Sequence, residues 1–249
     1  MSHQPMTVAG VEVLPLCDAV GPVGESIRRP LPEMFPGGRH GESDDWVLHF
    51  HCYLLRDTSG RTVLVDTGVG PEGSPASSWA PVPGALGAEL ARVGTAPEEV
   101  DAVVITHLHS DHASGAVADG VPAFPNARHL LQRAEIDLAD EGVLDHVVRP
   151  LGERVQALDG HAEVFPGIRI LHTPGHTPGH QVVQVGNLVL TGDVVLHPLQ
   201  LADPGVPYLY DDDPELAAVT RAELLERVRS ERGTIATAHF AEPFTRIGW

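Results

Sequence analysis

The 249-residue sequence predicts an α/β protein whose sheets pack between layers of helices. Short apolar runs of strand length occur along the whole chain, and helix-like segments fall between them in both halves. Several of these runs stop directly at a histidine or an aspartate. We therefore expect polar chemistry where the strands end.

Strands and helices are expected to alternate through the first two thirds of the chain. The early strand-like runs are residues 11–16, 46–55 and 62–68, and the polar turn RDTSGR joins the last two into a hairpin. A helical stretch follows at 84–94. Further strands are predicted at 101–106 and 128–132, and further helical stretches at 133–140 and 144–157.

The last third is predicted to contain two hairpins, a long helix and a final strand. The hairpins cover residues 161–172 and 181–193. Asp213 is a favourable N-cap and Gly233 suits the helix end, so the helix is expected between them, before a strand that ends at His239. Two long segments lack regular patterning and are expected to cover a site, residues 20–45 and 197–213.

The composition narrows the partners and the setting of the chain. The formal net charge is −18 and all 16 basic residues are arginine, so the basic patch that nucleic acid or an anionic membrane requires is not expected. We recognise no signal peptide and no apolar run of about 18 residues. Cys17 and Cys52 form no C-x-x-C pair. We therefore expect one cytoplasmic domain over residues 1–249, acting on a small molecule, with a homodimer left open.

The segment HLHSDH places four metal-binding side chains directly after an apolar run: His107, His109, Asp111 and His112. If the strand ends just before them, they extend from a loop at one edge of the sheet. Imidazole and carboxylate together suit Zn(II), with iron or manganese as second choices. The pattern H-x-H-x-D-H has a chance expectation on the order of 0.004 in a chain of this composition, so it is a specific signal.

Four further polar residues stand where apolar runs stop or turn. His176 lies in the Gly- and Pro-rich turn TPGHTPG, and Asp66, Asp193 and His239 each end a strand-like run. One metal site at a common sheet edge explains all of these positions together.

These motifs resemble those of the metallo-β-lactamase superfamily, in kind and in order along the chain: LVDTG at 64–68, HLHSDH at 107–112, TPGHTPG at 173–179, and the separate Asp193 and His239. The resemblance spans nearly the whole chain. It implies an αβ/βα four-layer sandwich, in which two central sheets are flanked by helices and a metal site lies at one sheet edge.

The resemblance also implies two divalent metal ions per chain, with zinc as the expected metal. The ligands of one ion would be His107, His109 and His176. Those of the other would be Asp111, His112 and His239, with Asp193 bridging the two ions. Asp66 matches a position that steadies the ligands from behind.

The charges of such a centre suit hydrolysis. Two divalent cations, two carboxylates and a bridging hydroxide leave a net charge of about +1, which polarises a carbonyl or phosphoryl oxygen. Metal coordination lowers the pKa of water towards ~7. We therefore expect a metal-bridging hydroxide as the nucleophile, and Asp111 as the catalytic residue that passes a proton to the leaving group.

Several activities within the superfamily fit this sequence poorly. An acidic, lysine-free chain would repel the polyanions that nucleases cut. Glyoxalase II uses basic residues of an added helical domain, which we do not expect after His239. Flavodiiron oxidoreductases carry a glutamate where this chain has His109, and β-lactamases generally lack a carboxylate that matches Asp193.

The nearest resemblance is to lactonases and the methyl-parathion-hydrolase-like group, which predicts hydrolysis of a neutral lactone or ester of a small apolar molecule. A phosphotriesterase, a thioesterase, an iron-dependent oxidoreductase and a metal-stabilised binding protein without turnover stay open. Homoserine-lactone lactonases place a tyrosine three residues after the bridging aspartate, where this chain has Leu196. Tyr208 and Tyr210 are candidates to replace it.

Loop residues are expected to wall the site and to hold its ligands. The apolar side chains of 195–210 and 31–36 would form the wall, although packing against the protein's own helices is an almost equal alternative. His172 and His180 are expected to have hydrogen-bonding roles, and His197 would either line the pocket or lie in a loop. His49 and His51 are interpreted as core or edge histidines.

Overall fold

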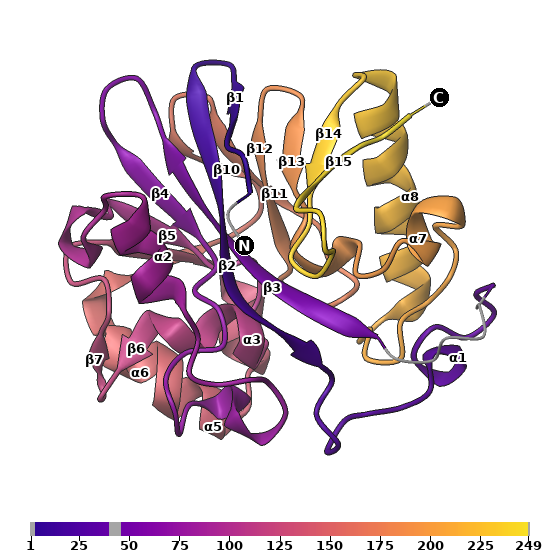
Figure 1. Ribbon diagram of the computed structural model, residues 1–249, viewed down its shortest axis with the longest axis horizontal. Helices are drawn as coiled ribbons and strands as arrows, with labels where there is room; N and C mark the ends of the chain where they lie inside the picture. Colours follow the sequence, from indigo (N-terminus) through magenta and orange to yellow (C-terminus); the bar gives the residue numbers. More distant parts are fainter. Residues whose placement is uncertain (1–2, 40–45, 249) are drawn as a thin grey trace.

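Two β-sheets lie face to face at the centre of the protein, and helices cover both outer faces (Figure 1). The computed structural model describes residues 3–39 and 46–248. On one side of the strands lie α2 (Leu86–Arg92), α3 (Ser110–Ala113), α5 (Glu141–Val143) and α6 (Arg149–Leu151), and on the other side lies α8 (Pro214–Ser230). This arrangement confirms the predicted α/β class and the αβ/βα four-layer sandwich.

The first sheet has seven strands in the order β1-β2-β3-β4-β5-β8-β9. Their bounds are Met6–Val8, Val11–Pro22, Val47–Arg56, Thr62–Val65, Ala102–Val104, Arg128–Gln132 and Val155–Leu158. The pairs from β1 to β4 are antiparallel, whereas β4-β5, β5-β8 and β8-β9 are parallel. The carboxyl ends of β4 and β5 therefore lie at the same edge of this sheet.

The second sheet has six strands in the order β10-β11-β12-β13-β14-β15. Their bounds are Ala162–Phe165, Ile168–His172, Gln181–Val185, Leu188–Leu190, Thr234–Ala236 and Phe244–Arg246. β13 and β14 pair in parallel, so their carboxyl ends also share an edge. A separate small hairpin is formed by β6 (Val117–Ala118) and β7 (Val121–Pro122).

Three apolar clusters hold the four layers together. The cluster between the sheets includes Val65 and Val104 from the first sheet and Ile170 and Leu190 from the second. A second cluster joins the outer face of the first sheet to its helices, and a third joins the second sheet to α8. The central strands β4, β5 and β13 are buried along their whole length, so they read as continuous apolar runs rather than as alternating ones.

Short helical segments fill most of the connections. The α-helical ones are α1 (Leu31–Met34), α4 (Arg133–Leu138) and α7 (Leu199–Ala202). The others are η1 (Pro75–Ser78), η2 (Pro97–Glu99), η3 (Ser114–Ala116), η4 (Leu144–Val148), η5 (Gly152–Arg154) and η6 (Gly192–Val194). The long helix α8 starts as predicted, because the Asp213 carboxylate accepts a hydrogen bond from the Leu216 N–H at 3.0 Å.

The structure differs from the sequence predictions at several places. The predicted helical stretch 144–157 gives way to β9 from Val155, because pairing with β8 decides the conformation there. β2 continues to Pro22 alongside β3, into a segment that we expected to be irregular. The rest of that segment contains α1, and its residues 40–45 lie outside the described ranges. The last predicted strand ends at Ala236 and not at His239.

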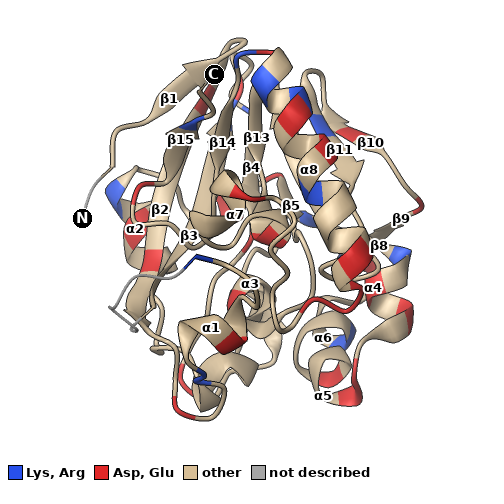
Figure 2. Ribbon diagram, turned by 90° about the vertical axis from the view of Figure 1, so that its right-hand side faces the viewer, with Lys and Arg blue, Asp and Glu red and all other residues tan. Residues whose placement is uncertain are grey.

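Acidic residues are spread over the helices and loops of the protein. Figure 2 shows Asp and Glu on many of the helices and loops that it faces, with Arg interspersed along α8. Within residues 3–39 and 46–248, no helix combines the length and the apolar character that crossing a membrane requires.

Candidate metal centre

Loops that follow strand ends bring the predicted residues to one edge of the sandwich. The HLHSDH segment follows β5 and runs into α3, and His176 lies in the loop between β11 and β12. Asp193 follows β13, and His239 follows β14. The parallel pairs β4-β5 and β13-β14 thus each deliver side chains from their carboxyl ends to the same place.

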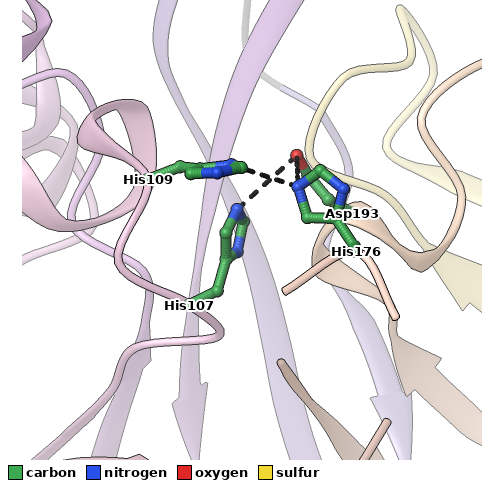
Figure 3. A group of neighbouring side chains, drawn as sticks. All are labelled: His107, His109, His176 and Asp193. Carbon is green, nitrogen blue, oxygen red and sulfur yellow. Dashed lines mark hydrogen bonds and ion pairs between the residues drawn. The ribbon is translucent and has the colours of Figure 1, made fainter. Parts of the chain in front are cut away.

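The predicted residues form two adjoining groups. The ligand atoms of the first group all lie within 4.8 Å of one another, and they belong to His107, His109, His176 and Asp193. The same limit holds for the second group, which consists of Asp111, His112 and His239. Figure 3 shows the four side chains of the first group pointing toward one another, and they come from three separate loops, after β5, between β11 and β12, and after β13. The structure therefore brings together every residue predicted as a ligand.

Two buried carboxylates fix the orientation of two of the imidazole rings. Nδ1 of His112 donates to Oδ2 of Asp66 at 2.8 Å, and Nδ1 of His176 donates to Oδ1 of Asp211 at 2.9 Å. A hydrogen bond at Nδ1 leaves the Nε2 lone pair of the ring directed into the centre. Both histidines are buried, so this orientation is enforced by the surrounding protein.

Neutral acceptors fix two further rings in the same way. Nδ1 of His239 donates to the backbone carbonyl of His49 at 3.0 Å, and Nδ1 of His107 lies 3.1 Å from the Thr106 hydroxyl. Each ring again presents Nε2 to the centre. Four histidines from three loops therefore share one coordination-ready arrangement.

Asp66 steadies the ligand loop through hydrogen bonds to Thr106 and His112, as the resemblance implied. Its carboxylate accepts hydrogen bonds from the Thr106 N–H at 2.7 Å and from the Thr106 hydroxyl at 2.9 Å, in addition to the bond from His112. Its φ of 60° lies in the left-handed region, which costs an L-residue roughly 1–2 kcal/mol. The three hydrogen bonds keep Asp66 in this conformation at the end of β4.

The two oxygens of the Asp193 carboxylate face different groups. Oδ2 lies 3.3 Å from Nε2 of His176 and 3.7 Å from Nε2 of His107. Oδ1 lies 3.1 Å from Nε2 of His239 and 3.2 Å from Nε2 of His112. The backbone N–H of Asp193 donates to Nε2 of His180 at 3.1 Å, so the loop that carries this carboxylate is itself anchored.

Buried polar atoms without partners test whether metal ions fit here. Among the described residues, Nε2 of His107, Nε2 of His112 and Oδ1 of Asp193 are buried and have no hydrogen-bond partner. Buried lone pairs without a partner cost free energy, and cations at this point would satisfy all of them. The Asp193 carboxylate adjoins both groups of ligand atoms, and the prediction of two divalent metal ions per chain is confirmed.

The titration behaviour of the centre has the same cause. Burial would raise the pKa of the Asp193 carboxyl, but the positive charges of His112 and His239 hold that pKa well below its usual range. Burial would lower the pKa of His176, but its hydrogen bonds to Asp193 and Asp211 raise that pKa to about 9. Burial lowers the pKa of His109 to about 4. The raised pKa favours the protonated form of His176, so a metal ion that binds there would displace a proton.

His172 and His180 make hydrogen bonds, as expected from the sequence. Nε2 of His172 lies 2.9 Å from the Pro178 carbonyl, and His180 contacts both Thr173 and the Asp193 amide. The rings of His49 and His51 stack at 5.5 Å in a buried position. The ring of His197 packs against Phe35 at 5.1 Å.

Two functional candidates have no counterpart in the sequence predictions. Asp211, which bonds His176, stands in the run DDD at 211–213, which reads as a solvated turn. Arg221, which contacts Asp211, sits in a helix where an exposed arginine is ordinary. No local pattern marks either residue, because the contacts that matter here, from Asp211 to His176 and from Arg221 to Val194, join positions distant in sequence.

A small cavity of about 190 Å³ opens over the centre. Its polar floor includes His109, Asp111, Asp193 and His239, and its walls include Ile27, Leu48, Trp79, Leu196, Tyr208 and Tyr210. The expected wall from 195–210 is therefore present. The prediction that residues 31–36 wall the cavity is wrong. Leu31, Met34 and Phe35 pack instead in a buried cluster with Leu196, within the protein itself.

Trp79 and Ser110 stand between this cavity and a wider one of about 750 Å³. Both residues line both cavities, and Nε1 of Trp79 donates to Oγ of Ser110 at 3.0 Å. The wider cavity includes Leu138, Glu135 and His146 in its lining. The two cavities thus adjoin at these residues.

An αβ/βα sandwich with two adjoining cation sites at its sheet edge defines a class of metalloprotein. The family model described as the metallo-beta-lactamase superfamily matches residues 47–239, and the chain belongs to this superfamily. The motif resemblance found in the sequence is thereby confirmed.

Known proteins similar to this chain include lactonases. An N-acyl homoserine lactonase of Bacillus thuringiensis is 33% identical over 214 residues, covering 77% of this chain and 81% of that protein. The structure of a mutant of B. thuringiensis AiiA with N-decanoyl-L-homoserine bound at the active site has a TM-score of 0.70 at 27% identity, covering 95% of each chain. The hydrolase AbOPH has a TM-score of 0.82 at 22% identity, covering 98% of this chain and 92% of that one, and this likeness concerns the fold.

Proposed function

We propose that the chain is a dinuclear metal-dependent hydrolase that opens neutral lactones, with N-acyl homoserine lactones as the substrate class. The observation that carries the proposal is the Asp193 carboxylate, whose two oxygens face two ligand groups directly beneath a small, walled cavity. The lactonase of B. thuringiensis, similar over most of both chains, supports the choice of lactones.

The proposed ligands of one ion are His107, His109 and His176, and those of the other are Asp111, His112 and His239, with Asp193 between them. Zinc is the proposed metal, because imidazole and carboxylate ligands suit it. When bound, the two ions would polarise the substrate carbonyl and lower the pKa of a coordinated water towards ~7. The protein residues contribute orientation, exclusion of water and proton transfer.

Asp111 is the proposed proton donor to the leaving alkoxide. Its Oδ2 lies 3.4 Å from Nε2 of His112 and 3.5 Å from Nε2 of His239, and the side chain also lines the cavity. It therefore adjoins both the ligands and the space where a substrate would lie. A carboxylate in that position can take a proton from the nucleophile and return it to the ring oxygen as the ring opens.

Tyr208 is the proposed contact to the substrate carbonyl. It would take the role of the tyrosine that homoserine-lactone lactonases carry at the position of Leu196. Its ring lies 6.0 Å from that of His176 and lines the cavity. Burial raises the pKa of its phenol well above the usual value, and the charges of Asp193 and Asp111 add to the shift. The phenol thus stays protonated and can donate a hydrogen bond to an oxygen that gains negative charge.

The cavity favours neutral substrates over anions. Among the described residues that line it, none is arginine. An acyl chain would bury apolar surface against Ile27, Leu48 and Trp79, at about 25 cal/mol per Å². An anionic phosphodiester or a glutathione thioester would meet no cationic side chain there.

A turnover screen with zinc-loaded protein tests the proposal. The substrates are N-hexanoyl homoserine lactone, an aryl ester, a neutral phosphotriester, a β-lactam, a phosphodiester and a glutathione thioester. We expect the lactone to give the highest kcat/KM, with a rise as the acyl chain lengthens until the cavity is filled. A higher kcat/KM for the phosphodiester or the thioester would contradict the proposal.

We also propose that residues 1–249 form a single domain that works in the cytoplasm. The free thiols of Cys17 and Cys52 fit a reducing compartment. The oligomeric state stays open between a monomer and a homodimer, and light scattering on the purified protein would measure it.

A further inference from the structure

A fully buried arginine ties the segment after Asp193 to helix α8. The Arg221 side chain has no exposed surface. Its Nε donates to the Val194 carbonyl at 2.6 Å, and its guanidinium also donates to the carbonyls of Pro204 and Val206 at 3.0 and 2.9 Å. Its remaining amino group lies 3.5 Å from Oδ2 of Asp211. One guanidinium thus contacts both ends of the segment that walls the cavity.

The carboxylate of Asp211 joins this arginine to the metal centre. Its side chain has no exposed surface either. Oδ1 accepts a hydrogen bond from Nδ1 of His176 at 2.9 Å, and Oδ2 accepts one from the Tyr208 N–H at 3.0 Å. A proposed metal ligand and the proposed substrate-binding tyrosine are therefore held by the two oxygens of one carboxylate.

Stability alone is a weak explanation for this arrangement. Desolvation of two buried charges often cancels their attraction, so well-packed apolar residues of similar volume would stabilise the fold as well or better. What the pair supplies is geometry, because the planar fork of Arg221 matches several acceptors at once. Each acceptor belongs to the segment between the Asp193 loop and Asp211.

We propose that Asp211 and Arg221 are positioning residues of the metal centre and its cavity. Asp211 orients the His176 ring so that Nε2 faces the first metal group, and Arg221 holds the segment that carries Leu196 and Tyr208. The part concerning Arg221 rests on the proposed function, since it concerns substrate binding. The part concerning Asp211 does not, because it concerns retention of the metal.

The substitution Asp211→Asn tests the metal part. It keeps the volume of the side chain and removes the charge that fixes the ring of His176. Release of zinc to a chromophoric chelator is followed on fully loaded protein. We expect one of the two ions to leave about 10- to 100-fold faster, the usual effect of losing such a partner, and the other to leave at its wild-type rate.

The matched control is Asp212→Asn, the same change at the neighbouring exposed carboxylate. We expect both ions to leave this variant at wild-type rates. Equal release from Asp211→Asn and wild-type protein would overturn the proposal for Asp211. So would equal acceleration of both ions, because that outcome indicates a general loosening of the fold and not an effect on one ligand.

The substitution Arg221→Lys tests the role of Arg221 in holding the cavity segment. Because it retains a cation beside Asp211, it also serves as a second variant if Asp211→Asn does not fold. A lysine cannot reach three carbonyls and a carboxylate with a rigid fork. We expect zinc release within about threefold of wild type, faster hydrogen exchange over residues 196–210, and a kcat/KM for N-hexanoyl homoserine lactone lowered about tenfold. Unchanged exchange over 196–210 would overturn the role of Arg221. If the protein turned over no lactone, the proposed function would fail. Zinc release and hydrogen exchange would still decide whether Asp211 and Arg221 are positioning residues.

Discussion

Removal of the Tyr208 hydroxyl tests the proposed contact to the substrate carbonyl and leaves the metal ligands unchanged. In Tyr208→Phe the ring remains, with its contacts to Phe35 at 5.3 Å and to Trp46 and His176 at 6.0 Å. The backbone also remains in place, because the Tyr208 N–H donates to Asp211. The variant therefore lacks one hydrogen-bond donor and little else.

The size of the effect follows from the charge on the acceptor. A hydrogen bond to a group that carries charge contributes about 1.5–3 kcal/mol, and the lactone carbonyl gains negative charge in the transition state. Loss of such a bond lowers kcat/KM roughly 10- to 150-fold. We expect the loss mainly in kcat, because the bond strengthens as the charge develops. Steady-state kinetics with N-hexanoyl homoserine lactone would measure it.

Tyr210→Phe is the matched comparison. The Tyr210 hydroxyl donates to the Ile27 carbonyl at 3.1 Å, so it is engaged within the protein although its ring lines the same cavity. We expect this variant to lose about 1 kcal/mol of stability and less than about threefold of kcat/KM. If Tyr208→Phe kept kcat/KM within threefold of wild type, or if Tyr210→Phe lost more than Tyr208→Phe, the role given to Tyr208 would be refuted.

Three further predictions concern protons and metal. Asp111→Asn should lower kcat about 100-fold or more, because the amide cannot carry the proton; near wild-type kcat on every substrate would exclude the role of Asp111. His239→Ala should lower the zinc content measured by elemental analysis from about two ions to about one, and an unchanged content would contradict the second group. In metal-free protein, burial would lower the pKa values of His112, His176 and His239, but nearby carboxylates raise them, that of His176 to about 9. Raised folded-state pKa values give stability that is fully present below about pH 6.5 and is lost as the pH rises through the folded-state values, so the Tm should fall between about pH 6.5 and pH 9; a constant or rising Tm over this range would disagree.

The sequence was sufficient to assemble the residues of the metal centre. Metal-binding side chains stand at the ends of apolar runs, and in a sandwich with parallel strand pairs those ends meet at one edge. HLHSDH carries most of this signal within six positions. Asp193 and His239 are single residues, which the order of the motifs made recognisable.

The sequence was insufficient wherever long-range packing decides the outcome. Most of Val155–Leu158 falls within the stretch 144–157 that was predicted to be helical, but the segment forms an edge strand because it pairs with β8. Leu31 and Phe35 look like cavity walls but are buried beneath Leu196. Asp211 and Arg221 resemble surface residues, and only the folded chain brings them to His176 and to the segment after Asp193. Local pattern carries no information on such contacts.

The most direct test of a two-ion lactone hydrolase is a zinc titration of metal-free protein. Lactone opening is followed through the proton released on hydrolysis of N-hexanoyl homoserine lactone, while zinc is added in steps of a fraction of an equivalent. We predict that activity rises to a plateau at two zinc ions per chain, with most of it appearing after the first equivalent is bound. A plateau at one ion per chain, or lactone opening that does not depend on zinc, would contradict the account.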